Sequence, residues 1–203
     1  MTAWRREQAR DRFFRRARVE GYRARSAYKL LELAERFKLI RPGSAVLDLG
    51  AAPGGWSQVA ARLAGPGARL VAVDLSAMAP IPGVVTLRCD ITDPGCLRQI
   101  REALKGDADV VLSDAAPSTS GIAVSDHVRS VDLGRAALDI ARQVLRPGGS
   151  FVVKVFRGAD FDAFVSQVRR HFQTARTVLP EATRRESREA YVVGLGFLRR
   201  EEG

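Results

Sequence analysis

Cysteine and histidine are scarce in this sequence, with two of each among 203 residues. Two cysteines, Cys89 and Cys96, cannot form the disulfide framework of a small secreted domain, and two histidines are too few for a His/Cys zinc site, so we expect no metal. No apolar run reaches the length of about 18 residues that a transmembrane helix needs. The start of the chain lacks the apolar core of a secretory signal. These absences predict a soluble, cytoplasmic protein of a reducing compartment, with no membrane partner.

Internal repeats and low-complexity stretches are also missing. The composition is that of a globular protein, with 46% hydrophobic residues, 18 Gly and 9 Pro. A chain of 203 residues is only a little longer than the usual domain of about 150. We therefore expect residues 1–203 to form a single domain. Nothing in the sequence indicates an obligate dimer, so we expect a monomer.

The positive charge is concentrated near the start of the chain. Residues 1–41 carry 13 Lys and Arg against 5 Asp and Glu, a net charge of +8, whereas the remaining 162 residues carry 20 against 18. Aromatic side chains are interleaved with these cations, at Trp4, Phe13, Phe14, Tyr22 and Tyr28. Cations that neutralise phosphates beside rings that stack on bases are typical of nucleic-acid contact. We predict a basic, helical, RNA-contacting segment at about 1–41, in preference to a tail that only aids solubility.

Lysine is rare among the cations. Of the 33 Lys and Arg residues, 29 are arginine, and the four lysines are Lys29, Lys38, Lys105 and Lys154. Arginine stays protonated in proteins, whereas a lysine can be tuned into a general base. The scarcity directs attention to Lys29 and Lys154, while chance explains Lys38 and Lys105 well.

Helical and strand-like patterns alternate along the chain. Short apolar runs predict strands at 44–50, 68–75, 84–90, 108–114 and 150–156, followed by two more at about 172–180 and 190–198. Helical spacing predicts helices at 26–40, with Ser26 as its N-cap, and at 56–64, 93–104, 126–146 and 160–171. Apolar strands separated by helices indicate an α/β fold, with a parallel sheet covered on both faces. Ligands of such sheets bind beyond the carboxyl ends of the strands.

Three aspartates fall at the ends of successive predicted strands. Asp48 precedes a loop of small residues (50–55), Asp74 ends the second strand and Asp90 closes the third. The loop lacks the spacing of a G-x-G-x-x-G turn or a P-loop, which disfavours a phosphate site. A carboxylate such as Asp74 can accept hydrogen bonds from both hydroxyls of a ribose, and Asp90 is placed for an adenine amino group. Any one of the three could instead cap a helix, but together they predict a nucleoside site.

These features resemble the FtsJ/RrmJ family of S-adenosylmethionine-dependent ribose 2′-O-methyltransferases. The resemblance rests on residues 48–56 (Asp-Leu-Gly-Ala-Ala-Pro-Gly-Gly-Trp) and, in the same order as in the family, on residues 25–30, 113–117, 153–156 and 187–191. It spans about residues 22–198. It implies a Rossmann-like methyltransferase fold with a mostly parallel seven-stranded sheet, and S-adenosylmethionine as the cofactor. It also implies a catalytic tetrad of Lys29, Asp114, Lys154 and Glu189, and cofactor contacts from Gly54, Trp56, Asp74, Asp90 and Asp114.

Methylation of a ribose hydroxyl sets its own chemical demand. The hydroxyl is a weak acid, so its reaction needs a base, or a cationic environment for the developing alkoxide. A partly desolvated lysine close to a second cation loses proton affinity. We hypothesise that Lys154 deprotonates the 2′-hydroxyl, that Lys29 tunes Lys154 and steadies the oxyanion, and that Asp114 and Glu189 orient the two lysines.

The resemblance points to a uridine in the peptidyl-transferase region of 23S rRNA, presented in the large (50S) ribosomal subunit. Three alternatives stay open: the same chemistry on tRNA or another RNA, a non-catalytic RNA-binding or ribosome-assembly module, and a nicotinamide dehydrogenase, which the loop spacing disfavours. Amine methylation fits poorly because Asp114 is followed by Ala-Ala-Pro-Ser rather than by Pro-Pro and an aromatic residue. Carbon methylation needs a cysteine nucleophile, and we expect Cys89 and Cys96 to be structural.

Overall fold

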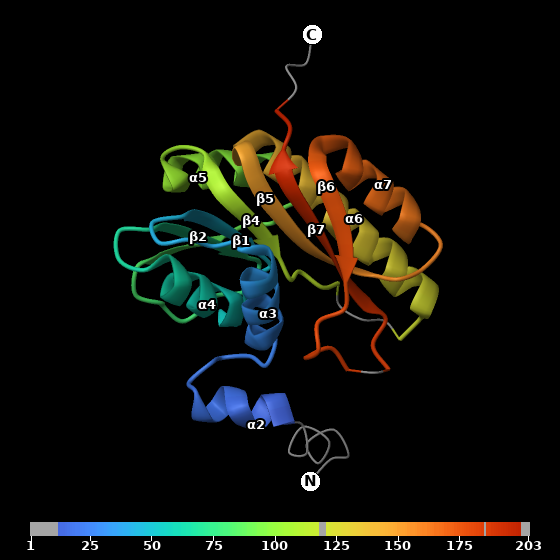
Figure 1. Cartoon of the computed structure of the whole chain (residues 1–203), viewed down its shortest axis with the longest axis horizontal. Helices are drawn as coiled ribbons and strands as arrows, with labels where there is room; N and C mark the ends of the chain where they lie inside the picture. Colours follow the sequence, from blue (N-terminus) through green and yellow to red (C-terminus); the bar gives the residue numbers. More distant parts are fainter. Residues whose placement is uncertain (1–11, 118–120, 185, 200–203) are drawn as a thin grey trace.

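One seven-stranded sheet forms the centre of the computed structural model, which describes residues 12–117, 121–184 and 186–199 (Figure 1). The order across the sheet is β3-β2-β1-β4-β5-β7-β6. The strands are β1 (Ala45–Leu49), β2 (Arg69–Asp74), β3 (Val84–Arg88), β4 (Ala108–Ser113), β5 (Leu145–Phe156), β6 (Phe172–Val178) and β7 (Glu189–Phe197). Strands β1 to β5 run parallel, and β7 pairs antiparallel with both β5 and β6. The predicted α/β fold with a mostly parallel seven-stranded sheet is confirmed.

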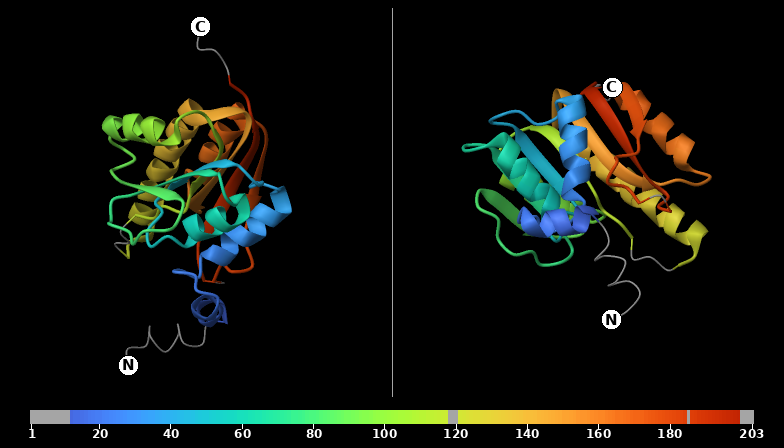
Figure 2. Two further views of the ribbon diagram at one scale, coloured as in Figure 1. Left: turned by 90° about the vertical axis from the view of Figure 1, so that its left-hand side faces the viewer. Right: turned by 60° about the horizontal axis from the view of Figure 1, so that its bottom comes forward.

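Helices cover both faces of the sheet (Figure 2). One face carries α3 (Ala27–Phe37) and α4 (Gly55–Ala64), and the other carries α5 (Pro94–Leu104), α6 (Ala123–Val144) and α7 (Phe161–His171). Successive strand residues point to opposite faces, so Val46 of β1 packs with α3 and α4 while Leu47 packs with the helices of the other face. This explains why β1 is apolar along most of its length. Within the described part of the chain, no helix has both the length and the apolar character that crossing a membrane requires.

The carboxyl ends of the central strands meet at one edge of the sheet. Leu49 of β1 is aligned with Val73 of β2 on one side and with Ser113 of β4 on the other. The residues that come next in the chain, Asp74 and Asp114, therefore lie on the two sides of the end of β1. Chain order reverses between β1 and β4, and sheets of this kind bind ligands at that point.

The basic N-terminal segment enters the described structure as α2 (Arg12–Val19). This helix lies outside the sheet, beyond the edge where β1 and β2 end (Figures 1 and 2). A small buried cluster of Ala17, Tyr28 and Ala182 joins it to α3 and to the connection between β6 and β7. Residues 1–11, which belong to the predicted RNA-contacting segment, lie outside the described residues.

Two local predictions were only partly right. Ser26 stands at the N-cap position of α3, as predicted, but its own backbone is already helical (φ −61°, ψ −18°) and its side chain makes no capping hydrogen bond. The backbone N–H groups of Ala27 and Tyr28 instead donate to the carbonyl groups of residues 24 and 25, so the helix needs no side-chain cap there. The long helix ends at Val144 rather than at residue 146, and β5 begins directly after it. Pro147 disfavours a helical conformation at the preceding residue, which brings the helix to an early end.

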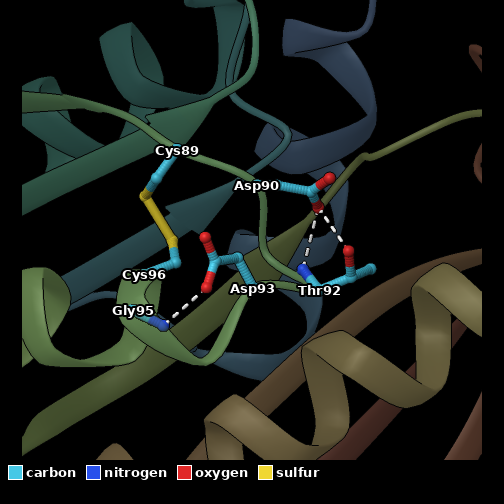
Figure 3. The surroundings of a disulfide bond; sticks show 6 residues. All are labelled: Cys89, Asp90, Thr92, Asp93, Gly95 and Cys96. Carbon is cyan, nitrogen blue, oxygen red and sulfur yellow. Dashed lines mark hydrogen bonds between the residues drawn. A yellow bond between two sulfur atoms is a disulfide. The ribbon is translucent and has the colours of Figure 1, made fainter.

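A disulfide bond joins Cys89 to Cys96 (Figure 3). From the two cysteines we expected no disulfide framework, and that expectation did not include this single bond. A reducing compartment, which we also expected, does not explain it. The intervening turn is tight: Asp93 N–H donates to the carbonyl of Asp90 at 3.0 Å, and Cys96 N–H donates to the carbonyl of Asp93 at 3.0 Å. The two cysteine Cα atoms lie 5.6 Å apart as a result. The bond connects the segment after β3 to the first turn of α5.

Candidate active site

A cavity of about 680 Å³ opens at the carboxyl edge of the sheet. It is lined by residues that follow four strands and by one side of α6, namely Gly50, Ala52, Asp74–Ser76, Cys89–Thr92, Asp114–Pro117, Arg129, Asp132 and Leu133, together with Lys154. A volume of this size is typical of a site for a small organic ligand. Its position is the one predicted from the alternation of strands and helices.

Asp74 ends β2 and Asp90 follows the neighbouring β3, and both residues line this cavity. Asp74 holds the adjacent loops, since it accepts hydrogen bonds from Ala52 N–H at 2.9 Å and from Ser76 N–H at 2.7 Å. Asp90 accepts two hydrogen bonds on Oδ1, from the backbone N–H of Thr92 at 2.9 Å and from its hydroxyl at 2.7 Å. These bonds, the backbone one first, lower the pKa of Asp90 below its usual range and keep it ionised. Its Oδ2 receives no hydrogen bond from the described residues.

Lys154 and Asp114 form a buried ion pair at the floor of the cavity. Lys154 Nζ lies 3.1 Å from Asp114 Oδ1 and donates to the Asp114 backbone carbonyl at 2.6 Å. The side chain of Lys154 is 6% exposed. Lys154 stands on β5 and Asp114 directly follows the neighbouring β4, so the parallel pairing of these two strands brings the pair together.

Lys29 and Glu189 form a second ion pair nearby. Lys29 Nζ donates to Glu189 Oε2 at 2.5 Å, and the lysine side chain is 9% exposed. Both residues line a second cavity of about 400 Å³, whose other lining residues are Arg25, Ser26, Asp114, Arg184, Glu186 and Ser187. Asp114 is thus common to the two cavities. The four predicted catalytic residues form two ion pairs, and Asp114, a member of the first pair, lines both cavities.

Tyr191 connects the two pairs and was not among the predicted site residues. Its hydroxyl donates to Asp114 Oδ1 at 2.8 Å, and the centre of its ring lies 5.5 Å from Lys29 Nζ. It is paired with Lys154 across β5 and β7 and is fully buried. Burial, and then the charge of Asp114, raise the pKa of Tyr191 well above its usual value, so it keeps the proton that it donates. The spacing of two residues from Glu189 is the signal that could have placed it on the same strand face.

Gly54 and Trp56, two of the predicted cofactor contacts, lie outside the set of residues that line the first cavity. Trp56 is 2% exposed, donates its indole N–H to the Ser26 carbonyl at 2.9 Å and stacks on Tyr191. It therefore packs α4 against the start of α3. Gly54 adopts φ 110°, a conformation that L side chains rarely take, and it precedes α4 as its N-cap residue.

Asp48 is buried beneath the loop of small residues. Ser57 donates its hydroxyl to Asp48 Oδ2 at 2.6 Å, while Oδ1 is buried without a hydrogen-bond partner among the described residues. Burial raises the pKa of Asp48 to about 7, against the opposing effect of the Ser57 hydrogen bond. Asp48 does not line the first cavity, so of the three aspartates at strand ends only Asp74 and Asp90 face it.

The residues present fit an adenosine-containing ligand such as S-adenosylmethionine. Two carboxylates at successive strand ends offer acceptors for ribose hydroxyls and for an amino group. The apolar side chains of Leu75 and Ile91 line the cavity near them and can flank a flat base. Among the described residues, no group of three or more His, Cys, Asp or Glu side chains is arranged to hold a metal ion.

A family model and curated relatives point to the same protein family. The family model described as FtsJ-like methyltransferase matches residues 22–197. Ribosomal RNA large subunit methyltransferase E of Methanothrix thermoacetophila is 54% identical over 188 residues, which cover 93% of this chain and 73% of that protein. The protein of the same name from Archaeoglobus fulgidus is 51% identical over 187 residues, covering 92% of this chain and 96% of that protein.

A solved structure agrees with this result. A Plasmodium falciparum protein described as a ribosomal RNA methyltransferase superposes with a TM-score of 0.80 at 30% identity, covering 88% of this chain and 100% of that one. The family model and the relatives each match most of the chain. The chain belongs to the FtsJ-like methyltransferase family.

Proposed function

We propose that this chain transfers a methyl group from S-adenosylmethionine to a ribose 2′-hydroxyl of RNA. The observation that carries the proposal is the meeting of two cavities at Asp114. The larger cavity has the carboxylates that suit an adenosine, and the smaller one has the Lys29–Glu189 pair and two arginines, Arg25 and Arg184. The smaller cavity also holds three carboxylates, Asp114, Glu186 and Glu189, so its charges balance. Its two arginines can contact the phosphates of an RNA strand that presents one ribose to a bound cofactor.

The cofactor would be held by Asp74 at its ribose and by Asp90 at its adenine, with Asp114 near its reacting end and the backbone around Gly54 and Trp56 supporting the loop. When bound, S-adenosylmethionine supplies an electrophilic methyl group. Lys154 lines the same cavity, and once its ammonium group has released a proton to solvent, the neutral Nζ can accept the proton of a ribose hydroxyl that approaches Asp114. Before that step, Asp114 and its backbone carbonyl hold the amine in place.

Lys29 has a separate task in this proposal. Its ammonium group, held by Glu189, provides positive charge for the oxyanion that forms as the hydroxyl loses its proton. Tyr191 fixes the position of one ion pair relative to the other, because it contacts Asp114 with its hydroxyl and Lys29 with its ring.

The proposed substrate is a uridine in the peptidyl-transferase region of 23S rRNA, within the large ribosomal subunit. Its support is that relatives at 51% and 54% identity are named as large-subunit ribosomal RNA methyltransferases. A monomer acting in the cytoplasm, where the subunits are assembled, is part of the same proposal. The basic N-terminal segment would hold the RNA.

The test is transfer of labelled methyl from S-adenosylmethionine to large ribosomal subunits, free ribosomal RNA and bulk tRNA, assayed in parallel. Alkaline hydrolysis follows, because a 2′-O-methyl group blocks cleavage of the adjacent phosphodiester. We expect the label in a hydrolysis-resistant dinucleotide from the large subunit. Label in tRNA alone would keep the chemistry and overturn the substrate, and absence of label despite cofactor binding would favour an RNA-binding module.

Lys154→Met tests the role of the base in the same assay. We expect turnover to fall by about 100-fold or more, the usual contribution of a general base, while affinity for S-adenosylhomocysteine changes little. Lys154→Arg is the matched variant, since it keeps a cation that cannot give up its proton. It should be as inactive as Lys154→Met, and substantial activity in Lys154→Arg would contradict proton transfer to Lys154.

A further inference from the structure

The segment from Cys89 to Asp93, here called the Asp90 loop, forms one wall of the first cavity. Cys89, Asp90, Ile91 and Thr92 all line it. The loop follows β3, which is the edge strand of the sheet and pairs with β2 alone. Most of β3 is at least partly exposed to solvent. The sheet therefore holds this wall of the cavity less firmly than the walls that follow β1 and β4.

Hydrogen bonds between residues close in the sequence give the Asp90 loop its shape (Figure 3). Asp90 accepts the two bonds from Thr92, and Asp93 N–H returns to the Asp90 carbonyl. Asp93 then caps α5 by accepting from Gly95 N–H at 2.8 Å. All of these bonds lie within the loop or at the start of the helix, so none of them fixes the end of β3 to the core.

The disulfide adds a covalent connection to the contacts that the pairing of β3 with β2 and the packing of Cys89 and Ile91 against the core already provide. Cys96 is 1% exposed and belongs to the main hydrophobic core together with Ile100 and Leu104 of α5. Cys89 is half-buried and immediately precedes Asp90. The bond thus attaches the residue next to Asp90 to a helix that is anchored in the core.

We infer that the Cys89–Cys96 disulfide is a positioning element for the adenosine end of the cofactor, so that cofactor affinity depends on the oxidation state of this bond. The inference rests on the proposed function, in which Asp90 contacts the adenine. With the bond closed, the Asp90 carboxylate is preorganised in the cavity wall, so ordering it costs less free energy when the cofactor binds. With the bond open, the loop keeps its own hydrogen bonds, the pairing of β3 with β2 and the packing of Ile91 against the core, but it loses its covalent attachment to α5.

The change of state is an exchange with a dithiol reductant. The S–S bond of Cys89–Cys96 breaks, each cysteine gains a proton and one electron, and the two thiols of the reductant become a disulfide. Reduction leaves all residues of the tetrad in place, because they lie on β4, β5, β7 and α3 or directly after them. The expected effect is therefore on cofactor binding and not on the chemical step.

Calorimetric titration with S-adenosylhomocysteine tests the inference on the full chain, oxidised and after treatment with a dithiol reductant. Thiol titration of the unfolded protein, once the reductant has been removed, verifies each state. We expect the dissociation constant to rise about five- to tenfold on reduction, as expected when a preorganised contact loosens. In methyl transfer, KM for S-adenosylmethionine should rise by a similar factor while kcat and KM for RNA stay the same.

The matched control is Cys89→Ser, in which the bond cannot form and the buried Cys96 is left intact. It should bind like the reduced protein and show no response to the reductant. Equal affinity in both states of the unchanged chain, or a fall in kcat and in thermal stability without a change in KM for the cofactor, would overturn the inference. Failure to bind S-adenosylhomocysteine in either state would instead overturn the proposed function on which it rests.

Discussion

At the scale of single residues, Asp48 shows how a buried carboxyl links the site to pH. Its pKa of about 7 in the folded protein lies above its ordinary value of 3.8. Between these two pH values the folded protein binds more protons than the unfolded chain, so ionisation of Asp48 lowers stability as pH rises. The cost is absent below about pH 4 and complete above about pH 7.

Asp48→Asn should therefore stabilise the fold at high pH, since it removes the charge and keeps an oxygen for the Ser57 hydroxyl. We expect a gain of about 2–4 kcal/mol at pH 8.5, from roughly three pKa units at 1.36 kcal/mol each, and only about 1 kcal/mol at pH 4.5. Urea unfolding of both proteins at the two pH values measures it. Asp132→Asn, at an exposed carboxylate, should show a difference of less than about 0.5 kcal/mol at either pH. An Asp48→Asn effect that is the same at both pH values would contradict the pKa assignment.

Among the predicted site residues, position was predictable where a strand end could be read from the sequence, while the role of each residue stays a prediction. Asp74, Asp90, Asp114 and Lys154 all belong to strand ends, and all four line the first cavity. Trp56 shows the limit of this reasoning, because a motif places an aromatic residue at a helix start without showing which way the ring faces. Its indole turns into the space between α3 and α4, where Ser26 offers a carbonyl.

At the scale of elements, Arg23 connects segments that the sequence presents separately. Its guanidinium donates to the carbonyl groups of Pro53 at 3.2 Å, Ala79 at 2.6 Å and Pro80 at 2.8 Å. Pro53 belongs to the loop after β1, and the other two belong to the connection between β2 and β3. One arginine of the basic segment thus holds together two loops next to the first cavity, a role that its charge alone did not suggest.

Arg23→Lys separates this clamp from attraction to RNA, because lysine keeps the charge but cannot serve three carbonyl groups in a fixed fork. We expect affinity for S-adenosylhomocysteine to fall about tenfold, or about 1.4 kcal/mol, while RNA binding at low salt stays unchanged. Calorimetry and RNA fluorescence anisotropy provide the two readouts. The control is Arg88→Lys, since Arg88 makes a single bond to the Leu75 carbonyl and should change cofactor affinity less than about twofold. A loss of RNA affinity with cofactor binding intact would show that Arg23 binds RNA and is not a clamp.

The strands and helices themselves were largely predictable because their patterns are local. Each predicted strand from 44–50 to 190–198 corresponds to a strand of the sheet, with ends that differ by a few residues. What could not be predicted depends on packing between elements. The Cys89–Cys96 bond requires that the end of β3 and the first turn of α5 face one another, which a count of cysteines does not reveal.

At the scale of the whole molecule, the excess of positive charge near the start of the chain can be assigned to one side of the structure. Residues 1–41 carry a net charge of +8, yet several of their cations already serve internal contacts: Arg16 pairs with Glu20, Arg23 clamps loops and Lys29 pairs with Glu189. Arg15 and Arg18 on α2 are exposed. Helix α2 lies beyond the carboxyl edge of the sheet (Figure 1), which is the edge that carries the two cavities.

An RNA strand that enters the smaller cavity would therefore pass near α2, and its phosphates would meet Arg15 and Arg18. The double variant Arg15→Gln/Arg18→Gln should lower the magnitude of the slope of log K against log salt by about 1.4–1.8, because each phosphate that is no longer neutralised removes about 0.7–0.9 from it. KM for RNA should rise without a change in kcat.

The control variant Arg169→Gln/Arg170→Gln removes the same charge from exposed positions on α7, on the opposite face from α3. Because this control changes net charge but not the proposed path, its slope should stay close to that of the unchanged protein. Equal slopes for the two double variants would show that RNA responds to the overall charge of the protein and not to this surface.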